Sequence, residues 1–297
     1  MKPTTTIGVC VKNCASCISG TIDSIQIQDY PHKFLEVVFV DDGSEDSTLS
    51  VIREYVPKLG MKTKVFSHEW RGLGPSRNVV VRNASGKYIV WVDGDMTLPV
   101  DHVRKQVEFM ENHPDVGIAK ARYGVLADEN LIGFLENAAY VGVDLIHGGK
   151  FTRRTVGTGG SIYRVEAIRG IGGFDDDLKG VGEDMDAELR MQEKGWLLYL
   201  GSPAIFYERR RKSVRAIWRE GVWHGYGGYD NFRKGRKVFS FYKMTPVIGF
   251  LAGVWYSVVA YREIKRKRVF LLPVQYSFKR VAWCFGFAKG QLRCVGN

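Results

Sequence analysis

Short apolar runs alternate with amphipathic stretches through the first third of the chain. Stretches with one apolar face predict helices, at residues 16–28, 47–59 and 75–84. The apolar runs between them predict buried strands, at residues 6–11, 35–40, 64–66 and 88–92. Strands and helices that alternate in this way build a mostly parallel central sheet that helices flank on both faces. The pattern therefore predicts an α/β fold.

The pattern after residue 100 is less regular but predicts further helices. An apolar stretch at residues 116–126 precedes a predicted helix at 129–146, and a glycine-rich segment follows at 155–161. Acidic residues open a predicted helix that ends at residue 194, and carboxylates are favourable in a first helical turn. From residue 213, apolar side chains recur at four-residue spacing and predict another helix.

Two pairs of carboxylates follow predicted strands. Asp93 and Asp95 come directly after the strand at 88–92, two residues apart, so that their side chains point the same way. Asp41 and Asp42 follow the strand at 35–40. Ligands of such sheets bind beyond the carboxyl ends of the strands, where these carboxylates can converge. Carboxylate oxygens suit Mg²⁺ or Mn²⁺, which in turn holds phosphate oxygens, and an ordinary Asp-Gly-Asp turn is the alternative.

The residues after the first strand argue against two common kinds of site. The chain continues there as Lys12-Asn13-Cys14 without a glycine-rich phosphate loop, which argues against a dinucleotide site and against a P-loop. Cys14 and Cys17 have a C-x-x-C spacing, but no second pair of metal ligands accompanies them. We interpret them as small apolar residues where the chain leaves the strand. An odd total of five cysteines fits a reducing compartment.

Charge is divided unequally along the chain. Lys and Arg number 43 against 32 Asp and Glu, which gives +11 overall. Residues 1–208 carry 23 basic and 29 acidic residues, whereas residues 209–297 carry 20 basic and 3 acidic residues. A region so basic belongs on an anionic partner, either nucleic acid or a membrane surface. Its apolar and aromatic composition favours the membrane, so we expect no nucleic acid partner.

Two apolar runs in the basic region indicate how it meets the membrane. Residues 244–261 are uncharged, and the run at 269–288 is interrupted by Lys279 and Arg280. A span needs about 20 apolar residues, and a hairpin of both runs would export the cationic segment 262–268 against the positive-inside tendency. No secretory signal precedes the first strand. We therefore expect helices in the interface at the cytoplasmic face of the cell membrane, with a single span as the alternative.

Five short motifs stand in order along the chain. They are Val40-Asp41-Asp42-Gly43-Ser44, Gly72-Leu73-Gly74-Pro75-Ser76-Arg77-Asn78, Asp93-Gly94-Asp95, Gly172-Gly173-Phe174-Asp175 and Gly182-Glu183-Asp184-Met185-Asp186. In this order they resemble glycosyltransferase family 2, inverting enzymes of GT-A fold that take sugars from nucleotide diphosphates. The resemblance implies a GT-A catalytic domain at residues 1–207. A basic amphipathic helical region at 208–243 and membrane-associated helices at 244–297 would follow it.

The resemblance implies roles for residues on the donor side. Asp42, with Asp41 beside it, would hold the base and ribose of a nucleotide sugar, and Arg77 would lie beside the nucleotide. Asp93 would face the ribose, and Asp95 would hold the Mg²⁺ or Mn²⁺ that bridges the diphosphate. A divalent cation there stabilises negative charge on the departing nucleoside diphosphate. The alternatives are a turn or cap residue for Asp42 and a surface charge for Arg77.

The resemblance also implies residues on the acceptor side. Asp184 would be the catalytic base, since a carboxylate can take the proton of an acceptor hydroxyl as it attacks, and a helix-dipole carboxylate is the alternative. Glu183 would orient its neighbour or the acceptor. His224, in the basic region, is a candidate for contact with the diphosphate, and a packed interfacial histidine is the alternative.

The predicted activity is transfer of a single sugar to a membrane-held acceptor, such as a polyprenyl phosphate or a lipid-linked glycan. Processive polysaccharide synthases of the family carry a Gln-x-x-Arg-Trp segment, which Arg215-Ala216-Ile217-Trp218 matches only faintly. One alternative is a nucleotidyltransferase on a related fold, which would need a glycine-rich loop that residues 7–20 lack. Another is a non-catalytic basic module that binds membrane or RNA, against which the intact carboxylates count.

Overall fold

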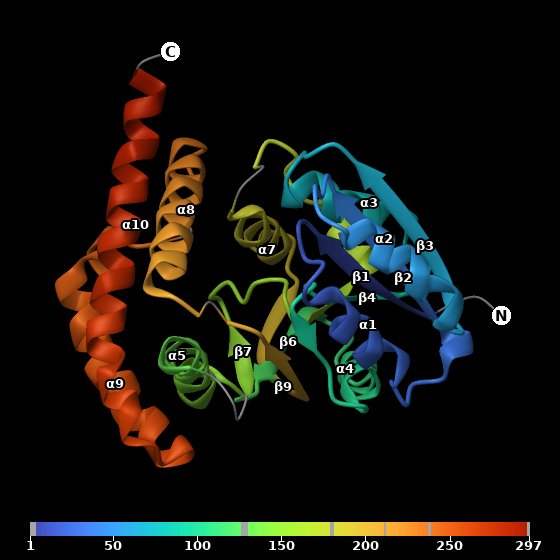
Figure 1. Ribbon diagram of the computed structural model, residues 1–297, viewed down its shortest axis with the longest axis horizontal. Coiled ribbons are helices and arrows are strands. Elements are labelled where there is room, and N and C mark those ends of the chain that lie inside the picture. Colours follow the sequence, from blue (N-terminus) through green and yellow to red (C-terminus); the bar gives the residue numbers. More distant parts are fainter. Residues whose placement is uncertain (1–3, 126–129, 179–180, 211, 237–238, 296–297) are drawn as a thin grey trace. The chain divides into compact units, whose positions relative to one another are not determined.

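The computed structural model describes residues 4–125, 130–178, 181–210, 212–236 and 239–295. The chain folds into two compact units (Figure 1). The first unit comprises Met1–Arg122, Gly149–Lys179 and Glu183–Glu208, and the second comprises Tyr123–Gly148, Gly180–Gly182 and Arg209–Asn297. The sheet belongs to the first unit, and the second unit consists mainly of long helices.

Four parallel strands form the part of the sheet that the apolar pattern predicts. They are β1 (Thr5–Val11), β2 (Leu35–Asp42), β3 (Lys62–His68) and β4 (Tyr88–Trp91). β1 pairs in parallel with β2 and β4, and β2 pairs in parallel with β3, so that the carboxyl ends share one edge. Every residue of β2 is buried, because helices cover both faces of the sheet there.

The sheet continues beyond β4 with strands that the sequence pattern does not predict. They are β5 (Met96–Thr97), β6 (Val116–Tyr123), β7 (Lys150–Thr152), β8 (Ser161–Arg164) and β9 (Leu197–Glu208). Within the described residues the nine strands lie in the order β3-β2-β1-β4-β8-β6-β9-β5, with β7 paired to β9. The predicted α/β fold is confirmed. Its sheet is mixed, because β8 enters antiparallel to both β4 and β6.

Three of the helices of the first unit share an aromatic core. The helices of this unit are α1 (Ile18–Gln26), α2 (Thr48–Tyr55), α3 (Leu73–Asn83), α4 (His102–Glu111), α6 (Val165–Gly170) and α7 (Glu183–Glu193), with 3₁₀ turns η1 (His32–Phe34) and η2 (Val56–Lys58). α3, α6 and α7 contact one another over a shared core. In that core, Trp91 of β4 meets Tyr163 and Phe174 edge-on, with ring centroids 6.1 and 5.7 Å away.

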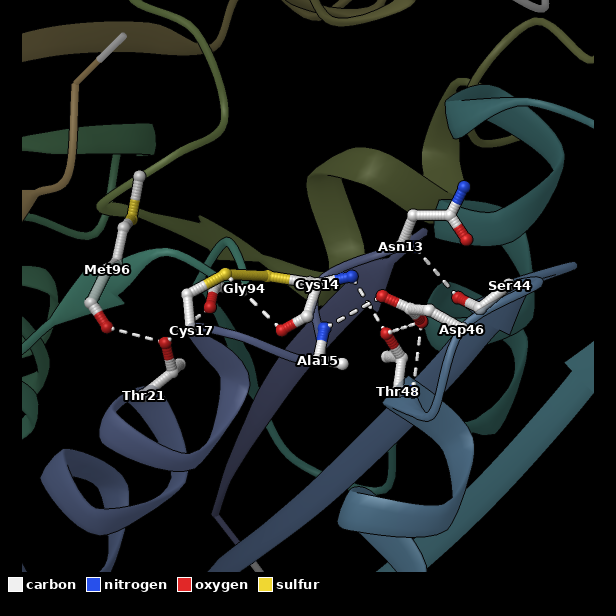
Figure 2. Close-up of a disulfide and its surroundings, with 10 residues drawn as sticks. All are labelled: Asn13, Cys14, Ala15, Cys17, Thr21, Ser44, Asp46, Thr48, Gly94 and Met96. Carbon is white, nitrogen blue, oxygen red and sulfur yellow. Dashed lines mark hydrogen bonds between the residues drawn. A yellow bond between two sulfur atoms is a disulfide. The ribbon is translucent and has the colours of Figure 1, made fainter. Parts of the chain in front are cut away.

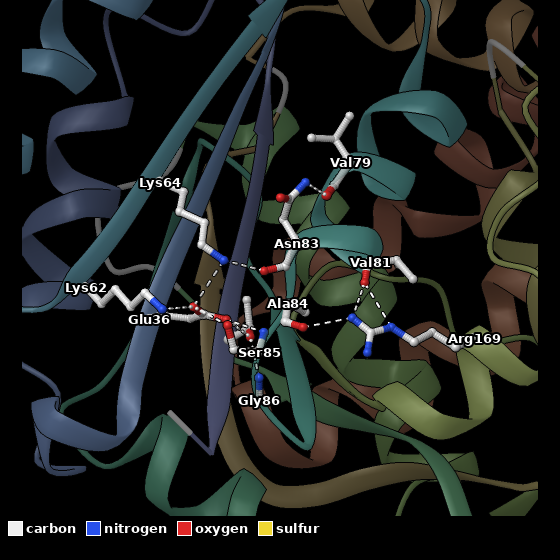
Figure 3. Close-up of polar contacts among 11 residues, drawn as sticks. Glu36, Lys62, Lys64, Val79, Val81, Asn83, Ala84, Ser85, Gly86 and Arg169 are labelled. Carbon is white, nitrogen blue, oxygen red and sulfur yellow. Dashed lines mark hydrogen bonds and ion pairs between the residues drawn. The ribbon is translucent and has the colours of Figure 1, made fainter. Parts of the chain in front are cut away.

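Polar contacts fix the carboxyl end of α3 and the turn that leads into β4 (Figure 3). Arg169 donates hydrogen bonds of 2.7 Å to the carbonyl oxygens of Val81 and Ala84. Carbonyls in the last turn of a helix have no intrahelical donor, so a cationic side chain satisfies them well. The buried carboxylate of Glu36 in β2 accepts a 3.0 Å hydrogen bond from the hydroxyl of Ser85. α3 is thereby held against the sheet.

The second unit is built from long helices. They are α5 (Leu131–His147), α8 (Val214–Arg233), α9 (Pro246–Ile264) and α10 (Leu272–Val295), with 3₁₀ turns η3 (Phe241–Met244) and η4 (Lys267–Leu271). The helices predicted at 129–146 and from 213 are confirmed, apart from residue 129, which lies outside the described residues. α8 and α10 approach closely because Gly225 and Gly286 face the partner backbone, where a Cβ atom would collide.

Large apolar side chains are exposed on the last two helices. Val247, Leu251 and Trp255 of α9 and Val274 of α10 are 58–70% exposed. Contiguous apolar surface of this kind is uncommon in soluble proteins. Within the described residues, α9 is the one helix that is long and apolar enough to cross a membrane, and 22% of its apolar window is buried. This length and composition fit an interfacial helix as well as a span.

Buried His102 makes the stability of the first unit sensitive to acid. Its Nδ1 donates a 2.6 Å hydrogen bond to the carbonyl oxygen of Ile205 in β9, and burial lowers its pKa to about 4. In the unfolded chain its pKa returns to about 6.5. The unfolded state therefore binds the extra proton as the pH falls from about 6.5 to about 4. We expect this residue to lower the free energy of unfolding by about 1–3 kcal/mol across that interval.

Denaturant unfolding of the wild type and of His102→Asn between those pH values measures this effect. The amide of asparagine keeps a donor for the Ile205 carbonyl but does not titrate. The variant should lose less stability on acidification than the wild type. Equal losses in the two proteins would contradict the assignment to His102.

Candidate functional site

The charged residues of the motifs are brought together at the end of β1. Burial raises the pKa of the Cys10 thiol in β1 to about 12; the charge of Arg77 opposes this rise, and the carboxylates of Asp93, Asp42 and Glu183 add to it. These four charged side chains come from α3, from the segment after β4, from β2 and from α7. Residues far apart in the sequence therefore form one cluster at the carboxyl edge of the parallel strands, where ligands of such sheets bind.

The two aspartates at the end of β2 have different partners. Asp42 accepts hydrogen bonds from the backbone N–H groups of Arg71 (2.8 Å) and Gly72 (3.0 Å). Asp41 accepts one from the N–H of Ser44 (3.2 Å), and its Oδ1 atom is buried without a hydrogen-bond partner among the described residues. A buried acceptor without a partner costs about 1–3 kcal/mol. Asp42 thus holds the turn before α3, and Asp41 is better placed to accept a hydrogen bond from a ligand.

Arg77 lies at the centre of the cluster. Its Nη1 atom donates to Oε1 of Glu183, at the start of α7, and both side chains are buried. Its Nη2 atom lies 4.0 Å from a carboxylate oxygen of Asp93. The guanidinium also lies over the rings of Trp91 and Phe174, 5.9 and 5.8 Å from their centroids, an arrangement that favours a cation. The alternative of a surface charge for Arg77 is therefore wrong.

The two charges of this buried pair depend on each other. Burial by itself lowers the pKa of Arg77, but the carboxylates of Glu183, Asp93 and Asp184 outweigh burial and raise it, so the guanidinium stays protonated. Burial raises the pKa of Glu183, and the Arg77 guanidinium opposes that rise. Removal of one partner from a buried ion pair typically costs about 3–5 kcal/mol, because the other charge is left uncompensated.

Asp184 lies beside Glu183 in the first turn of α7. Its Oδ1 atom accepts a 2.8 Å hydrogen bond from the N–H of Met185, and the side chain is half-buried. Asp186, two residues further on, is buried and forms an ion pair of 2.7 Å with Arg190. Asp184 is therefore the aspartate of this helix that retains access to solvent, as a catalytic base requires.

The glycine-rich segment at 155–161 approaches the carboxylates closely. A Cβ atom added at Gly159 would lie 2.5 Å from the carboxylate of Asp93 and 2.5 Å from the methyl carbon of Met96. Gly157 has a φ of 78°, which few residues other than glycine adopt. A Cβ atom there would lie 3.6 Å from Oδ2 of Asp184. The segment therefore lies against both acidic motifs.

Glu188 holds this segment in place, although no motif singles it out. Its carboxylate accepts hydrogen bonds from the N–H groups of Val156 (2.6 Å) and Gly157 (2.7 Å) and from the hydroxyl of Tyr163 (3.1 Å). Burial and the nearby charge of Asp184 raise its pKa to about 8 despite these hydrogen bonds. In the sequence, Glu188 is marked only by its position four residues after Asp184 on one predicted helix. That spacing is ordinary in helices, so it does not indicate a functional residue.

Lys120 is a second functional candidate that sequence reasoning misses. It is buried in β6, donates to the carbonyl oxygen of Gly159, and lies 5.2 Å from the ring centroid of Phe206. A lone lysine inside the apolar stretch 116–126 is the signal that could have found it, since buried lysines are rare unless they have partners. Lys120 places a positive charge beside the glycine-rich segment.

The structure corrects the interpretation of the C-x-x-C spacing. Cys14 and Cys17 are joined by a disulfide just before α1 (Figure 2). The pair lies against the Asp-Gly-Asp turn: a Cβ atom at Gly94 would lie 2.9 Å from Sγ of Cys14. Thr21 of α1 donates a 2.8 Å hydrogen bond to the carbonyl oxygen of Gly94. The cysteines therefore help to fix this turn.

Asp93 and Asp95 provide oxygen ligands without forming a complete metal site. Within the described ranges, no three His, Cys, Asp or Glu side chains are grouped closely enough to hold a metal ion. The Asp93 side chain is 42% exposed, and Asp95 is half-buried. Mg²⁺ is commonly held by one or two carboxylates, with waters and substrate phosphates as the other ligands. The residues present therefore fit a cation that is held jointly with a diphosphate.

His224 belongs to the second unit, whereas Asp42, Arg77, Asp95 and Asp184 belong to the first. It belongs to α8 and lines a cavity of about 210 Å³ together with residues of α5 and α10. Its ring centroid is 5.7 Å from that of Trp223. Contact between His224 and a diphosphate stays a prediction.

Comparison with known sequences gives one family match and several partial relatives. The sequence model of glycosyl transferase family 2 matches residues 6–172. The poly(ribitol-phosphate) β-N-acetylglucosaminyltransferase TarS of Staphylococcus aureus is 32% identical over 111 residues, 37% of this chain and 19% of that protein. The poly-β-1,6-N-acetyl-D-glucosamine synthase of Staphylococcus epidermidis is 21% identical over 229 residues, 73% of this chain and 53% of that protein. The chain thus spans about a fifth to a half of these relatives.

Solved structures share the fold. The mannosyltransferase PcManGT from Pyrobaculum calidifontis, in complex with GDP-Man and Mn²⁺, matches with a TM-score of 0.69 and 18% identity over 98% of this chain and 88% of that one. Residues 1–349 of S. aureus TarS, in complex with UDP-GlcNAc, match with a TM-score of 0.54 and 14% identity over 99% of this chain and 92% of that one. At such identities the likeness shows the fold, and the predicted GT-A fold is confirmed.

Substitution Gly159→Ala tests the close approach of the glycine-rich segment to Asp93. The added methyl group would have to displace the Asp93 carboxylate and the methyl carbon of buried Met96. Overpacking typically costs about 1–3 kcal/mol, so we expect a lower unfolding temperature. Gly170→Ala is the matched control, because a Cβ atom there meets nothing within 4 Å. Thermal unfolding of both variants measures the difference. An unchanged unfolding temperature in Gly159→Ala would show that the segment lies farther from Asp93.

Proposed function

The chain belongs to glycosyl transferase family 2, and from this premise we propose that it transfers a single sugar, with inversion, from a nucleotide-diphosphate donor to a membrane-held acceptor. The observation that carries the proposal is the cluster of Asp93, Asp184 and Glu183 around the buried guanidinium of Arg77. Such a cluster combines oxygen ligands for a cation, a fixed positive charge and a solvent-accessible carboxylate. Those are the groups that transfer from a diphosphate leaving group requires.

The donor would bind at the ends of β2 and β4. PcManGT was solved with GDP-Man and TarS with UDP-GlcNAc, which supports a nucleotide sugar as the donor here. The unpartnered oxygen of Asp41 would accept a hydrogen bond from the base, and Asp42 would hold the turn beside it. Asp93 would face the ribose. Arg77 would keep its charge next to the diphosphate, since the carboxylates around it hold it protonated.

A divalent cation would be held by Asp95 with Asp93 nearby. The complex of PcManGT with Mn²⁺ supports the use of a divalent cation such as Mg²⁺ or Mn²⁺. When bound, the cation would stabilise the negative charge that develops on the nucleoside diphosphate as it leaves. Gly94 lets the turn between the two aspartates approach Cys14, since a Cβ atom there would lie 2.9 Å from Sγ, so the fold fixes the backbone from which the two carboxylates extend.

Asp184 would act as the catalytic base. It would take the proton of the acceptor hydroxyl while that oxygen bonds to the anomeric carbon and the bond to the diphosphate breaks on the opposite side. General-base catalysis of this kind contributes about 10²–10⁴-fold. Glu183 would orient its neighbour rather than react, because it is buried and paired with Arg77.

The composition of the second unit supports a membrane-held acceptor. Its last helices expose large apolar side chains, and residues 209–297 carry 20 basic residues against 3 acidic. We propose that the helical regions 208–243 and 244–297 place a catalytic domain at 1–207 on the cytoplasmic face of an anionic membrane. The acceptor would be a polyprenyl phosphate or a lipid-linked glycan, and the sugar would be a hexose or a related unit.

Substitution Asp95→Ala tests the metal site. We expect turnover of UDP-, GDP- or dTDP-sugars to require Mg²⁺ or Mn²⁺ and to fall by about 10²–10³-fold or more in the variant, because charge stabilisation at the diphosphate is lost. Release of nucleoside diphosphate, with extracted membrane lipids as acceptor, measures this. Asp23→Ala, which removes an exposed aspartate of α1, is the control and should retain activity. Full activity without a divalent metal would refute the role of Asp95.

Substitution Asp184→Asn distinguishes the two kinds of acceptor. A hydroxyl must lose its proton, so the variant should lose about 10²–10⁴-fold in kcat with a lipid-linked glycan. A lipid phosphate is already anionic and needs little help from a base, so the loss should be only a few-fold. The same release assay with each acceptor class gives the answer. Wild-type rates with every acceptor would show that Asp184 is not the base.

A further inference from the structure

Two cavities that share a lining residue lie in the second unit. One, the polar cavity, has tyrosine, histidine, glutamine, lysine and arginine side chains among the apolar ones of its lining, and the other is apolar. The polar cavity, of about 210 Å³, lies between α5, α8 and α10 and is lined by Tyr140, His224 and Arg280 among others. The apolar cavity, of about 250 Å³, lies between the same three helices and is lined by Ile217 and other aliphatic and aromatic side chains. The side chain of Gln275 lines both. Together they have the chemistry of a site for one amphipathic ligand.

The polar cavity holds a positive charge that no carboxylate of the described residues neutralises. Lys279 is paired with Glu136 at 2.8 Å, so these two charges cancel. Arg280 donates from Nη1 to the sulfur of Met244 at 3.1 Å, and a thioether is a weak acceptor. Among the residues that the structure describes, no carboxylate forms an ion pair with Arg280. A partly desolvated guanidinium of this kind gains free energy when an anion binds.

Gln275 supplies an independent sign of a missing partner. It is 8% exposed, and its Nε2 atom donates to Oε1 of Glu136. Its Oε1 atom is buried without a hydrogen-bond partner in the part of the chain that the structure describes. An unmatched buried acceptor is costly. A ligand with anionic oxygens for Arg280 and a hydroxyl hydrogen for the Gln275 oxygen would satisfy both side chains. A singly protonated phosphate monoester has both groups, and its second pKa is about 6.

The apolar cavity opens onto exposed apolar surface. Two of its lining residues, Leu271 and Val274, are 45% and 63% exposed. They continue into the exposed apolar side chains of the same helices, including Phe270. An apolar chain in this cavity would therefore leave it toward surface that itself suits the acyl region of a membrane.

We propose that the two cavities together bind a lipid monophosphate with one apolar chain. The phosphate would lie against Arg280, with His224 and Gln275 as further hydrogen-bond partners, and the chain would pass between Ile217 and Val274. This inference rests on the proposed transfer to a membrane-held acceptor and narrows that acceptor to a lipid phosphate. It also gives His224 a role in the second unit in place of contact with the donor diphosphate.

Direct binding of farnesyl phosphate to the full-length protein in neutral detergent micelles tests the proposal without any donor present. Farnesol, inorganic phosphate and an anionic phospholipid, phosphatidylglycerol, are the comparison ligands. We expect farnesyl phosphate to bind at least about tenfold more tightly than each of them, since one charge-assisted hydrogen bond contributes about 1.5–3 kcal/mol. Equal affinity for farnesol would rule out the anion site, and equal affinity for inorganic phosphate would rule out the apolar cavity as part of it. Equal affinity for phosphatidylglycerol would make the surface a general membrane contact.

Variants locate the site. Arg280→Gln should weaken binding about tenfold or more, whereas Arg268→Gln, which removes an exposed arginine of η4, should leave it unchanged. Val274→Trp should fill the mouth of the apolar cavity and weaken farnesyl phosphate but not inorganic phosphate. Val274 is exposed, so this variant keeps the test valid even if Arg280→Gln does not fold. Wild-type affinity in Val274→Trp would overturn the proposal.

The lipid-binding site and the proposed transferase function can be tested separately. Asp95→Ala should lose sugar turnover while it keeps wild-type affinity for farnesyl phosphate. Loss of lipid binding in Asp95→Ala would place the phosphate at the sheet and overturn the cavity assignment. Sugar transfer by a wild-type protein that does not bind farnesyl phosphate would overturn this inference and leave the transferase function standing.

Discussion

The buried ion pair between Arg77 and Glu183 is the interaction on which the site depends. It joins α3 to α7, and through the same guanidinium it reaches Asp93 after β4. A buried pair adds little net stability over apolar side chains, but separation of its partners leaves a charge without compensation. The pair therefore fixes how the two helices meet the strand ends. The rings of Trp91 and Phe174 support the guanidinium, so the cluster of carboxylates is arranged around a charge that the fold itself holds.

The sequence predicts the part of the site that local patterns determine. Apolar runs locate the parallel strands, and the carboxylates that follow β2 and β4 must share an edge because those strands are parallel to β1. Lys120 and Glu188 could not be found in this way. Their partners lie in the segment 155–161, which the antiparallel half of the sheet brings to the site, and such pairings join residues far apart in sequence. The bond between Cys14 and Cys17 also escapes prediction, because a C-x-x-C spacing is compatible with either state.

In the second unit, too, the sequence predicts some features and not others. Four-residue apolar spacing and uncharged runs predict its helices, and composition predicts its preference for an anionic partner. The cavities between α5, α8 and α10 are not predictable, since they arise where side chains from three separate segments fail to fill the space between them. Most of the positive charge in this region is exposed and suits a membrane surface, whereas packing has partly withdrawn Arg280 from water. One chain thus combines a general electrostatic attraction with a specific anion site.

The central claim is that Arg77 and Asp95 hold one diphosphate at the end of β4, with Asp184 nearby as the base for the acceptor. A crystal structure of the full chain with a nucleoside diphosphate and Mn²⁺ tests it most directly, because anomalous scattering identifies the metal. The account predicts a manganese ion coordinated by a carboxylate oxygen of Asp95 and by the diphosphate, with the base beside Asp41 and open space next to Asp184. A metal bound elsewhere, or a diphosphate away from the carboxyl edge of the parallel strands, would contradict it.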